Sequence, residues 1–195
     1  MSTIAFYDQH SQDFFESTVN VDVSELYYAF LSNLPTNARI LDAGCGSGRD
    51  TKAFIQMGFN VTAIDASAEL AKVATDYIGQ HVTVCTFDQI DPTLTFDAIW
   101  ACASLLHVDA SVLPDTFTHL ANTLVDNGAF YCSFKYGIQD RTHNGRFFTD
   151  ADESRLQQWL KNTGLIIKHT WITADARPDR ENEKWLNAIL IKAVK

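Results

Sequence analysis

The chain has 195 residues, of which 46% are hydrophobic and 20% are charged, a balance typical of a folded globular domain rather than a disordered segment. Its formal net charge of −9 argues against broad binding to nucleic acid or to an anionic membrane surface, because both need a positive field. No apolar run reaches the ~18 residues that a membrane span needs, and no signal peptide is recognisable. We expect a cytoplasmic protein, monomeric or homodimeric.

Strand-like and helix-like segments alternate along most of the chain, which is typical of an α/β domain with a mostly parallel sheet. Residues 1–34 are expected to form helices. The expected elements that follow are a strand at 38–43, a helix at 50–57, a strand at 59–65, a helix around 70–77, strands at 82–87 and 96–102, a helix at 112–125 and a strand at 128–136.

The end of the chain departs from this alternation. Thr149 is expected to cap a helix that stops near Gly164, because a carboxylate follows Thr149 by three residues. Two strand-like runs follow, at 165–173 and 184–193, with no helix between them, so they are most simply antiparallel neighbours. The expected fold is a Rossmann-like three-layer sandwich with a seven-stranded, mostly parallel sheet that ends in an antiparallel hairpin.

The most informative segment joins the first strand to the next helix. Gly44, Gly46 and Gly48 alternate there, which permits a tight turn and the close approach of a ligand at the carboxyl edge of the sheet. A dinucleotide site expects G-x-G-x-x-G, but Arg49 stands at the place of the third glycine. Asp42 precedes the loop, and a carboxylate at this position disfavours a diphosphate.

Acidic residues at the strand ends suit a different ligand. S-adenosylmethionine (SAM) carries an ammonium and a sulfonium and has no phosphate, so an acidic strand end attracts it. Asp65 ends the second strand. A carboxylate at this position accepts hydrogen bonds from both ribose hydroxyls, in SAM and in a dinucleotide alike. Asp88 follows the third strand and is placed to accept a hydrogen bond from the adenine amino group.

The chain resembles a class I SAM-dependent methyltransferase of the small, stand-alone bacterial kind, similar to the tellurite-resistance and biotin-synthesis methyltransferases. The resemblance covers roughly residues 35–195. Asp126 and Asn127 depart from the usual Lys-Pro of the family, at a turn remote from the cofactor. The segments that carry the resemblance are Ile40 to Gly48, Ala63 to Ser67, Phe87-Asp88, Phe96 to Ala101 and Leu124 to Phe130.

The resemblance implies a cofactor site and a two-part organisation. The glycines would pass close to the methionyl part of SAM, Asp42 would meet its amino group, and Asp65 would hold the ribose. Residues 1–34 would form a helical lid, with Tyr7 and Phe14 facing the acceptor, over a methyltransferase domain at 35–195. The full implied set for the cofactor is Asp42, Gly44, Cys45, Gly46, Gly48, Arg49, Asp65, Ala66, Ser67, Asp88, Gln89, Ala101 and Cys102.

Several of these residues also have plain structural interpretations. Arg49 either holds the SAM carboxylate or pairs with a nearby carboxylate. Cys45 and Cys102 are favoured as small apolar fillers, because a catalytic thiol needs an activating environment. His107 follows the fourth strand, where the loop faces the acceptor, and it is either a general base or a hydrogen-bonded wall of the pocket. No cysteine pair has metal-ligand spacing, so no metal is expected.

A basic cluster stands out in this acidic chain. The loop after the fifth strand carries Lys135, Arg141, His143 and Arg146, and the loop after the sixth strand carries Arg177 and Arg180. Both loops are expected at the carboxyl edge of the sheet, where α/β proteins bind ligands. The cluster either binds an anionic acceptor, through a carboxylate or phosphate, or is a solvated loop with ordinary ion pairs.

The sequence thus predicts transfer of the SAM methyl group to a small acceptor by in-line displacement, and the acceptor is anionic under the first of the two interpretations of the basic cluster. Alignment of the acceptor behind the methyl is sufficient for this chemistry, which fits the absence of a recognisable triad or metal motif in the sequence. Two alternatives stay open: a SAM-binding regulatory module without catalysis, and a methyltransferase for a modified tRNA nucleoside. An NAD-dependent oxidoreductase is disfavoured, because Arg49 stands where the dinucleotide-binding motif has its third glycine.

Overall fold

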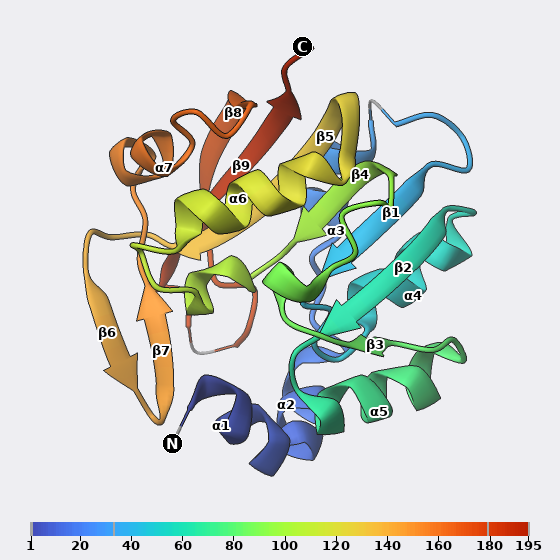
Figure 1. Cartoon of the computed structure of the whole chain (residues 1–195). Coiled ribbons are helices and arrows are strands. Elements are labelled where there is room, and N and C mark those ends of the chain that lie inside the picture. Colours follow the sequence, from blue (N-terminus) through green and yellow to red (C-terminus); the bar gives the residue numbers. More distant parts are fainter. Residues whose placement is uncertain (1, 33, 179, 195) are drawn as a thin grey trace.

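A seven-stranded sheet forms the centre of the computed structural model, which describes residues 2–32, 34–178 and 180–194 (Figure 1). The strand order is β3-β2-β1-β4-β5-β9-β8. The first five strands in this order are parallel, and β9 pairs antiparallel with both β5 and β8, as expected. The strands are β1 (Arg39–Ala43), β2 (Asn60–Asp65), β3 (Thr83–Val84), β4 (Phe96–Ala101), β5 (Leu124–Lys135), β8 (Leu165–Ala174) and β9 (Lys184–Lys192).

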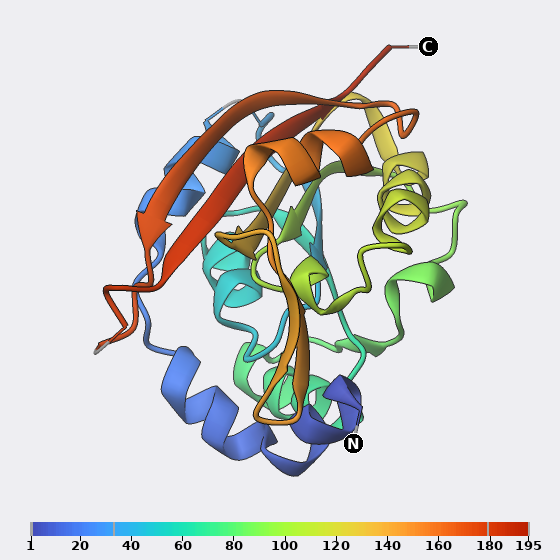
Figure 2. The same ribbon diagram turned by 90° about the vertical axis from the view of Figure 1, so that its left-hand side faces the viewer.

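Helices cover both faces of the sheet, which confirms the three-layer architecture (Figure 2). Helices α3 (Ser24–Leu31), α4 (Arg49–Gln56) and α5 (Ala68–Ile78) lie on one face, and α6 (Leu113–Asn122) and α7 (Glu153–Trp159) lie on the other. Successive strand residues point to opposite faces, so Ile99 of β4 packs toward α6 while Trp100 packs toward α3 and α4. Strands buried on both faces are the usual consequence of this arrangement.

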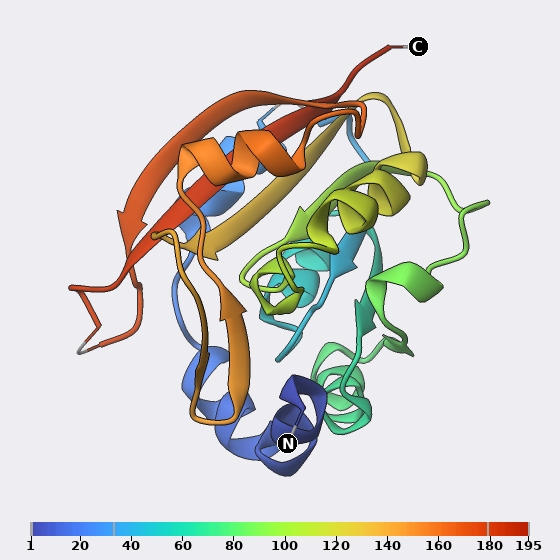
Figure 3. The same cartoon turned by 60° about the vertical axis from the view of Figure 1, so that its left-hand side comes forward.

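Two further segments lie beyond the carboxyl ends of the parallel strands. Helices α1 (Thr3–Gln9) and α2 (Ser11–Thr18) cross this edge, and a hairpin of β6 (Asp140–His143) and β7 (Arg146–Thr149) extends down to α1 (Figures 1 and 3). Asn144 and Gly145 form the hairpin turn with positive φ angles of 49° and 77°. An Asn-Gly pair is the preferred occupant of such a turn, because both residues tolerate the left-handed conformation.

The structure corrects four of the expected elements. The third strand is limited to Thr83–Val84, and Phe87 begins a short 3₁₀ helix, η1 (Phe87–Gln89), instead of ending the strand. The segment 135–148 contains a hairpin rather than a loop. Thr149 belongs to β7 and donates its hydroxyl to the Val108 carbonyl, so it is not a helix cap. The expected helix over 112–125 ends at Asn122, and β5 begins two residues later.

Asp152 takes the capping role that the sequence suggested for Thr149. Its carboxylate accepts a hydrogen bond from the Arg155 backbone N–H, at 2.8 Å, and helix α7 therefore starts at Glu153. A carboxylate at this position satisfies one of the free N–H groups of the first turn. Among the helices in the described parts of the chain, none has the length and apolar content to cross a membrane.

Candidate active site

A cavity of about 1510 Å³ opens at the carboxyl edge of the sheet. The glycine loop after β1 and the turn after β4 form its floor, and α1, α2 and the β6–β7 hairpin form its walls. Strand β1 lies between β2 and β4 in the sheet. From β1 the chain builds outward in one direction through β2 and β3, and then in the opposite direction through β4 and β5, so the strand order reverses beside β1. Ligands of open α/β sheets bind in the crevice at this switch point.

The backbone amides of the glycine loop already have partners inside the protein. Gly44 N and Cys45 N both donate to the Ile64 carbonyl oxygen, at 3.0 and 2.9 Å. Gly46 N donates to Asp65 Oδ2 at 2.9 Å, and Gly48 N donates to the Cys45 carbonyl oxygen at 2.9 Å. A loop that binds a diphosphate needs such amides directed at the ligand. These four are not available for that purpose.

Glycine is required in this loop by both backbone conformation and space. Gly44 has a φ of +85°, and a Cβ built on it would lie 2.6 Å from Ser104 Cβ. Gly46 has a φ of +56°, and its Cβ would approach the Phe14 ring at 3.1 Å. The ring of Phe14 therefore packs directly against the loop, which brings α2 over the floor of the cavity.

Asp65 lies at the end of β2 with its carboxylate facing the cavity. Each oxygen accepts one backbone N–H: Oδ2 that of Gly46 and Oδ1 that of Ser67, both at 2.9 Å. Burial raises the pKa of Asp65 above the ordinary carboxylate value, although these hydrogen bonds act in the opposite direction. Each oxygen keeps a further lone pair, so the carboxylate is able to accept two more hydrogen bonds.

Asp42 lies beneath the loop and does not line the cavity, with 2% of its surface exposed. It accepts a hydrogen bond from Thr51 Oγ1 at 2.5 Å. Burial raises the pKa of Asp42, and the nearby Asp50 carboxylate raises it further. In this structure Asp42 therefore supports the loop from below.

Arg49 pairs with the residue that follows it, which was one of its two expected roles. Its Nε donates to Asp50 Oδ1 at 2.6 Å, and Asp50 also accepts hydrogen bonds from the Tyr27 hydroxyl and the Trp100 indole N–H. Although burial opposes it, the Arg49 guanidinium holds the pKa of Asp50 below its usual value. Asp50 also lines the cavity, but its place there was not predictable from local sequence, because its hydrogen-bond partner Trp100 comes from a strand 50 residues away.

Most of the other residues implied for the cofactor also line this cavity. Gln89 does not line it: its side chain accepts the Thr86 N–H at 2.9 Å and so caps η1. At the end of β4 the wall is made by Cys102 and Ala103 rather than by Ala101, and Ala103 has a left-handed φ of 51°. The cavity is lined by Gly44, Cys45, Gly46, Arg49, Asp65, Ala66, Ser67, Asp88 and Cys102, but not by Asp42, Gly48, Gln89 or Ala101.

His107 meets Tyr7 at the wall formed by α1. The Tyr7 hydroxyl lies 2.8 Å from His107 Nε2, and His107 Nδ1 lies 2.6 Å from the Phe147 carbonyl oxygen. A carbonyl only accepts, so Nδ1 carries the proton and Nε2 accepts the tyrosine hydroxyl. Burial, together with the positive charge of Arg146, lowers the pKa of His107 to about 4. The imidazole is therefore neutral at pH 7.

The N-terminal helix is tied to both sides of the cavity. Thr3 Oγ1 accepts the Phe147 N–H of the hairpin at 2.9 Å. On the opposite side, Asp8 accepts the Ser67 hydroxyl at 2.6 Å. Tyr7 lies between these two anchors, so the position of its hydroxyl depends on how α1 docks.

The expected basic cluster does line one cavity, but most of its members have acidic partners. Lys135 pairs with Asp175 at 2.8 Å and with Glu183, and Arg177 pairs with Asp175 at 2.6 Å. Arg141 pairs with Asp150, and Arg180 lies 3.6 Å from Glu183. His143 lies exposed on the hairpin. Arg146 forms no ion pair with any carboxylate of the described residues.

The cysteines behave as the sequence suggested for small apolar fillers. Burial raises the pKa of the Cys102 thiol to about 12 and that of Cys45 well above its usual value, so both thiols are protonated at pH 7. All four cysteines are free. Within residues 2–32, 34–178 and 180–194, no cluster of three or more His, Cys, Asp or Glu side chains is arranged to hold a metal.

Comparisons with known proteins point to one family. A family model described as "Methyltransferase domain" matches residues 15–173. A ubiquinone biosynthesis O-methyltransferase of Xanthomonas axonopodis pv. citri is 33% identical in an alignment 162 residues long that covers 69% of this chain. The chain spans 65% of the length of that relative.

Solved structures share the fold at lower identity. A 1,6-didemethyltoxoflavin N1-methyltransferase of Burkholderia thailandensis, solved with 1,6-didemethyltoxoflavin and S-adenosylhomocysteine (SAH), matches with a TM-score of 0.74 and 22% identity, over 98% of this chain and 85% of that one. A TehB-like SAM-dependent methyltransferase of Corynebacterium glutamicum matches with a TM-score of 0.71 and 18% identity, over 97% of both chains.

Proposed function

Since the chain belongs to the methyltransferase-domain family, we propose that it binds SAM and transfers the methyl group to an oxygen of a small-molecule acceptor. The observation that carries this proposal is a cavity with a carboxylate-lined glycine loop on one side and the Tyr7–His107 pair on the other. The curated relative from Xanthomonas is named as an O-methyltransferase, which supports oxygen as the methylated atom.

The residues of the cavity fit SAM better than a dinucleotide. The four loop amides at Gly44, Cys45, Gly46 and Gly48 are used within the protein, which leaves little for a diphosphate. The free lone pairs of Asp65 suit the two ribose hydroxyls, and Asp88 lies farther along the same cavity for the adenine amino group. Arg49 balances the charge of the neighbouring Asp50, so the carboxylates of Asp65 and Asp88, which form no ion pair with the described residues, are what favour a cationic cofactor at this lining.

The donor supplies an activated methyl carbon bonded to a positively charged sulfur. The protein has then to hold the acceptor oxygen in line behind that carbon, exclude water and remove the hydroxyl proton. As the carbon–oxygen bond forms, the carbon–sulfur bond breaks and its electron pair stays on sulfur, giving SAH. Alignment of the two reactants contributes roughly 7–11 kcal/mol to lowering the barrier.

Tyr7 and His107 are placed to take the proton. Tyr7 donates its own proton to His107 Nε2, and beside the hydrogen bond from Arg146 its oxygen keeps one lone pair to accept a proton from an acceptor hydroxyl. The proton of the acceptor passes to Tyr7 as the proton of Tyr7 passes to Nε2. The Phe147 carbonyl holds the imidazole in the tautomer that makes this possible.

The N-terminal helices have a separate role in the proposal. Residues 1–34 act as a lid over a methyltransferase domain at residues 35–195, with Tyr7 and Phe14 on its inner side. The contacts of Thr3 and Asp8 with the two rims of the cavity support this role. Closure of the lid would bring Tyr7 to His107 and shield the reacting atoms from water.

The test has two steps. Thermal unfolding with and without SAH measures cofactor binding, because a ligand that binds the folded state alone raises the melting temperature. The purified protein is then incubated with SAM and fractionated cell extract, and mass spectrometry searches for molecules that gain one methyl group. Stabilisation by SAH together with a methylated product supports the proposal. Stabilisation without any product supports a SAM-binding module, and no stabilisation contradicts both.

A further inference from the structure

Arg146 differs from the other basic side chains of the cavity. Lys135, Arg141, Arg177 and Arg180 each lie against a carboxylate of the protein, so their charges are already balanced. Arg146 lines the same cavity and pairs with no carboxylate in the described part of the chain. It is therefore a positive charge that the described residues leave uncompensated.

The surroundings of Arg146 hold it in place and satisfy it only in part, because the Tyr7 hydroxyl oxygen lies within its hydrogen-bonding reach while no carboxylate of the described residues pairs with it. Its guanidinium carbon lies 4.9 Å from the ring centre of Phe6, 5.2 Å from that of Phe148 and 5.9 Å from that of Tyr7. These aromatic faces attract a cation, but they do not accept its N–H groups as an oxygen would. Its Nε is buried and has no hydrogen-bond partner among the described residues. A buried charged donor without a partner is unfavourable until a ligand supplies an acceptor.

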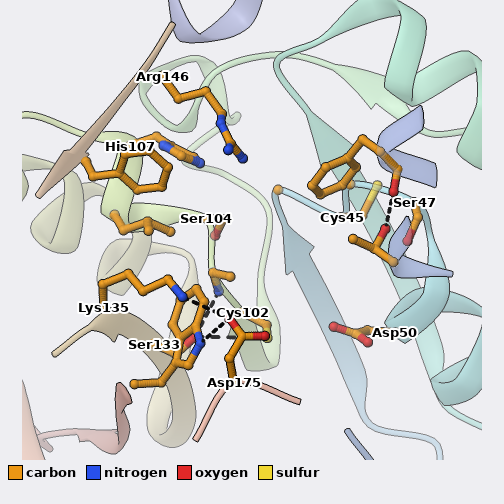
Figure 4. Close-up of a pocket in the computed structure, with 18 of the residues that line it drawn as sticks. Cys45, Ser47, Asp50, Cys102, Ser104, His107, Ser133, Lys135, Arg146 and Asp175 are labelled. Carbon is orange, nitrogen blue, oxygen red and sulfur yellow. Dashed lines mark hydrogen bonds and ion pairs between the residues drawn. The ribbon is translucent and has the colours of Figure 1, made fainter. Parts of the chain in front are cut away.

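The position of Arg146 relates it to the acceptor rather than to the cofactor. In Figure 4, Arg146 lies beside His107, while Cys45 and Ser47 of the glycine loop lie across the cavity from both. The hairpin carries Arg146 to this place, and the next residue, Phe147, is the one whose carbonyl holds His107. The guanidinium and the proposed base therefore face the same part of the cavity.

We propose that Arg146 binds a carboxylate of the acceptor, which makes the substrate class a small organic acid with an apolar, ring-bearing body. This inference rests on the proposed methyl transfer and specifies its acceptor. The planar guanidinium presents paired N–H donors that match the two oxygens of a carboxylate. Apolar side chains complete this part of the cavity and suit the body of such a molecule: Tyr7, Phe14, Leu106, Val108 and Phe148.

An anionic group on Arg146 has a consequence for the proton transfer. The positive charge of Arg146 is one cause of the low pKa of His107, which makes the imidazole a weak base. A carboxylate bound at Arg146 neutralises that charge and makes His107 a stronger base. An acceptor without the carboxylate would leave the base weak, so the same contact contributes to binding and to selectivity.

The experiment uses the full-length protein saturated with SAH and matched pairs of probes. The pairs are 4-hydroxybenzoate with 4-hydroxybenzamide and 3,4-dihydroxybenzoate with its amide; phenyl phosphate is a separate probe. NMR titration gives the dissociation constants. We expect each acid to bind about tenfold or more tightly than its amide, as a charge-assisted bidentate contact would give. Arg146→Gln should abolish this preference, and Arg146→Lys should retain part of it.

Arg155→Gln is the matched control, because Arg155 also packs on an aromatic ring, at 5.0 Å from Trp159, but does not line the cavity. It should leave the preference unchanged. Equal binding of acids and amides, a preference that survives Arg146→Gln, or binding of phenyl phosphate alone would overturn the assignment. Thermal stabilisation by SAH in every variant shows that the protein is folded and that cofactor binding is intact. Its absence in the wild type would count against the proposed function instead.

Discussion

Tyr7 and His107 stand 100 residues apart in the chain, yet the hydroxyl of one lies 2.8 Å from Nε2 of the other. Helix α1 brings the tyrosine, the turn after β4 brings the histidine, and the hairpin fixes the histidine through its Nδ1. The pair thus joins three segments at the cavity wall. A contact of this kind is built only when α1 is docked.

Removing either member of the pair should slow methyl transfer without weakening cofactor binding. With the acceptor identified as above, His107→Gln is expected to lower kcat by about 10²–10⁴-fold, the usual contribution of a positioned base, and Tyr7→Phe should lower it in the same direction. Isothermal titration should give unchanged affinity for SAH. His119→Gln is the control, because His119 bonds to the Ile90 carbonyl outside the cavity. A His107 variant with normal kcat would exclude the histidine from the proton transfer.

The pH dependence should reflect the low pKa of His107. With its pKa at about 4, the histidine stays neutral from pH 8 down to the acid range, so kcat/KM should show no fall centred near 6.5. The unfolded chain binds the proton at the ordinary value of ~6.5, so it takes up more protons than the folded protein between these two values. The free energy of unfolding should therefore rise with pH across that window.

His107→Gln isolates this contribution, because glutamine does not titrate in the same range. Denaturant unfolding at several pH values should give a shallower rise for the variant than for the wild type between about pH 4 and 6.5. Parallel curves for the two proteins would show that His107 titrates normally in the folded state.

Asp65 should control cofactor affinity. Asp65→Asn replaces one acceptor oxygen with an NH₂ group, which opposes the N–H group of either Gly46 or Ser67 and removes an acceptor for one ribose hydroxyl. Because hydrogen bonds to charged groups contribute about 1.5–3 kcal/mol each, we expect a loss of affinity for SAH of about 10–100-fold. Asp97→Asn is the control, since Asp97 pairs with Arg39 away from the cavity. Equal affinities for both variants would remove Asp65 from the cofactor site.

Gly44 should be intolerant of a side chain for reasons of space. Gly44→Ala adds a Cβ 2.6 Å from Ser104 Cβ and should destabilise the fold by about 1–3 kcal/mol beyond the cost of backbone strain. Gly58→Ala supplies the comparison, because Gly58 also has a positive φ, +91°, but nothing lies within 4 Å of the added Cβ. Urea unfolding measures both. A similar loss in the two variants would mean that Ser104 moves aside.

The sequence predicted the parts of the fold that repeat a local pattern. Alternating strand-like and helix-like segments indicated a mostly parallel sheet that ends in an antiparallel hairpin, and the glycines between β1 and α4 located the cavity. The β6–β7 hairpin was missed although Asn144-Gly145 is a hairpin signal, because the flanking residues 140–143 are polar and do not alternate as a buried strand does. Thr149 was mistaken for a helix cap because Asp152 follows it by three residues, which is the spacing of a capping box.

The pairing of charges was not predictable in the same way. All six basic residues of the cluster looked alike in sequence, and only the folded chain shows that Asp150, Asp175 and Glu183 balance most of them. Arg146 differs from the others because aromatic rings surround it instead of carboxylates. One of these rings belongs to Phe6, which lies 140 residues away in the sequence. Long-range partners of this kind leave no trace in local spacing.

The central claim is that the acid-lined glycine loop binds a sulfonium cofactor. Isothermal titration of the wild-type protein with SAM, SAH and NADH tests it most directly. We predict that SAM and SAH each bind with one site per chain, that each displaces the other, and that NADH produces no heat of binding. Failure of both adenosyl compounds to bind, or binding of NADH in competition with them, would contradict the account.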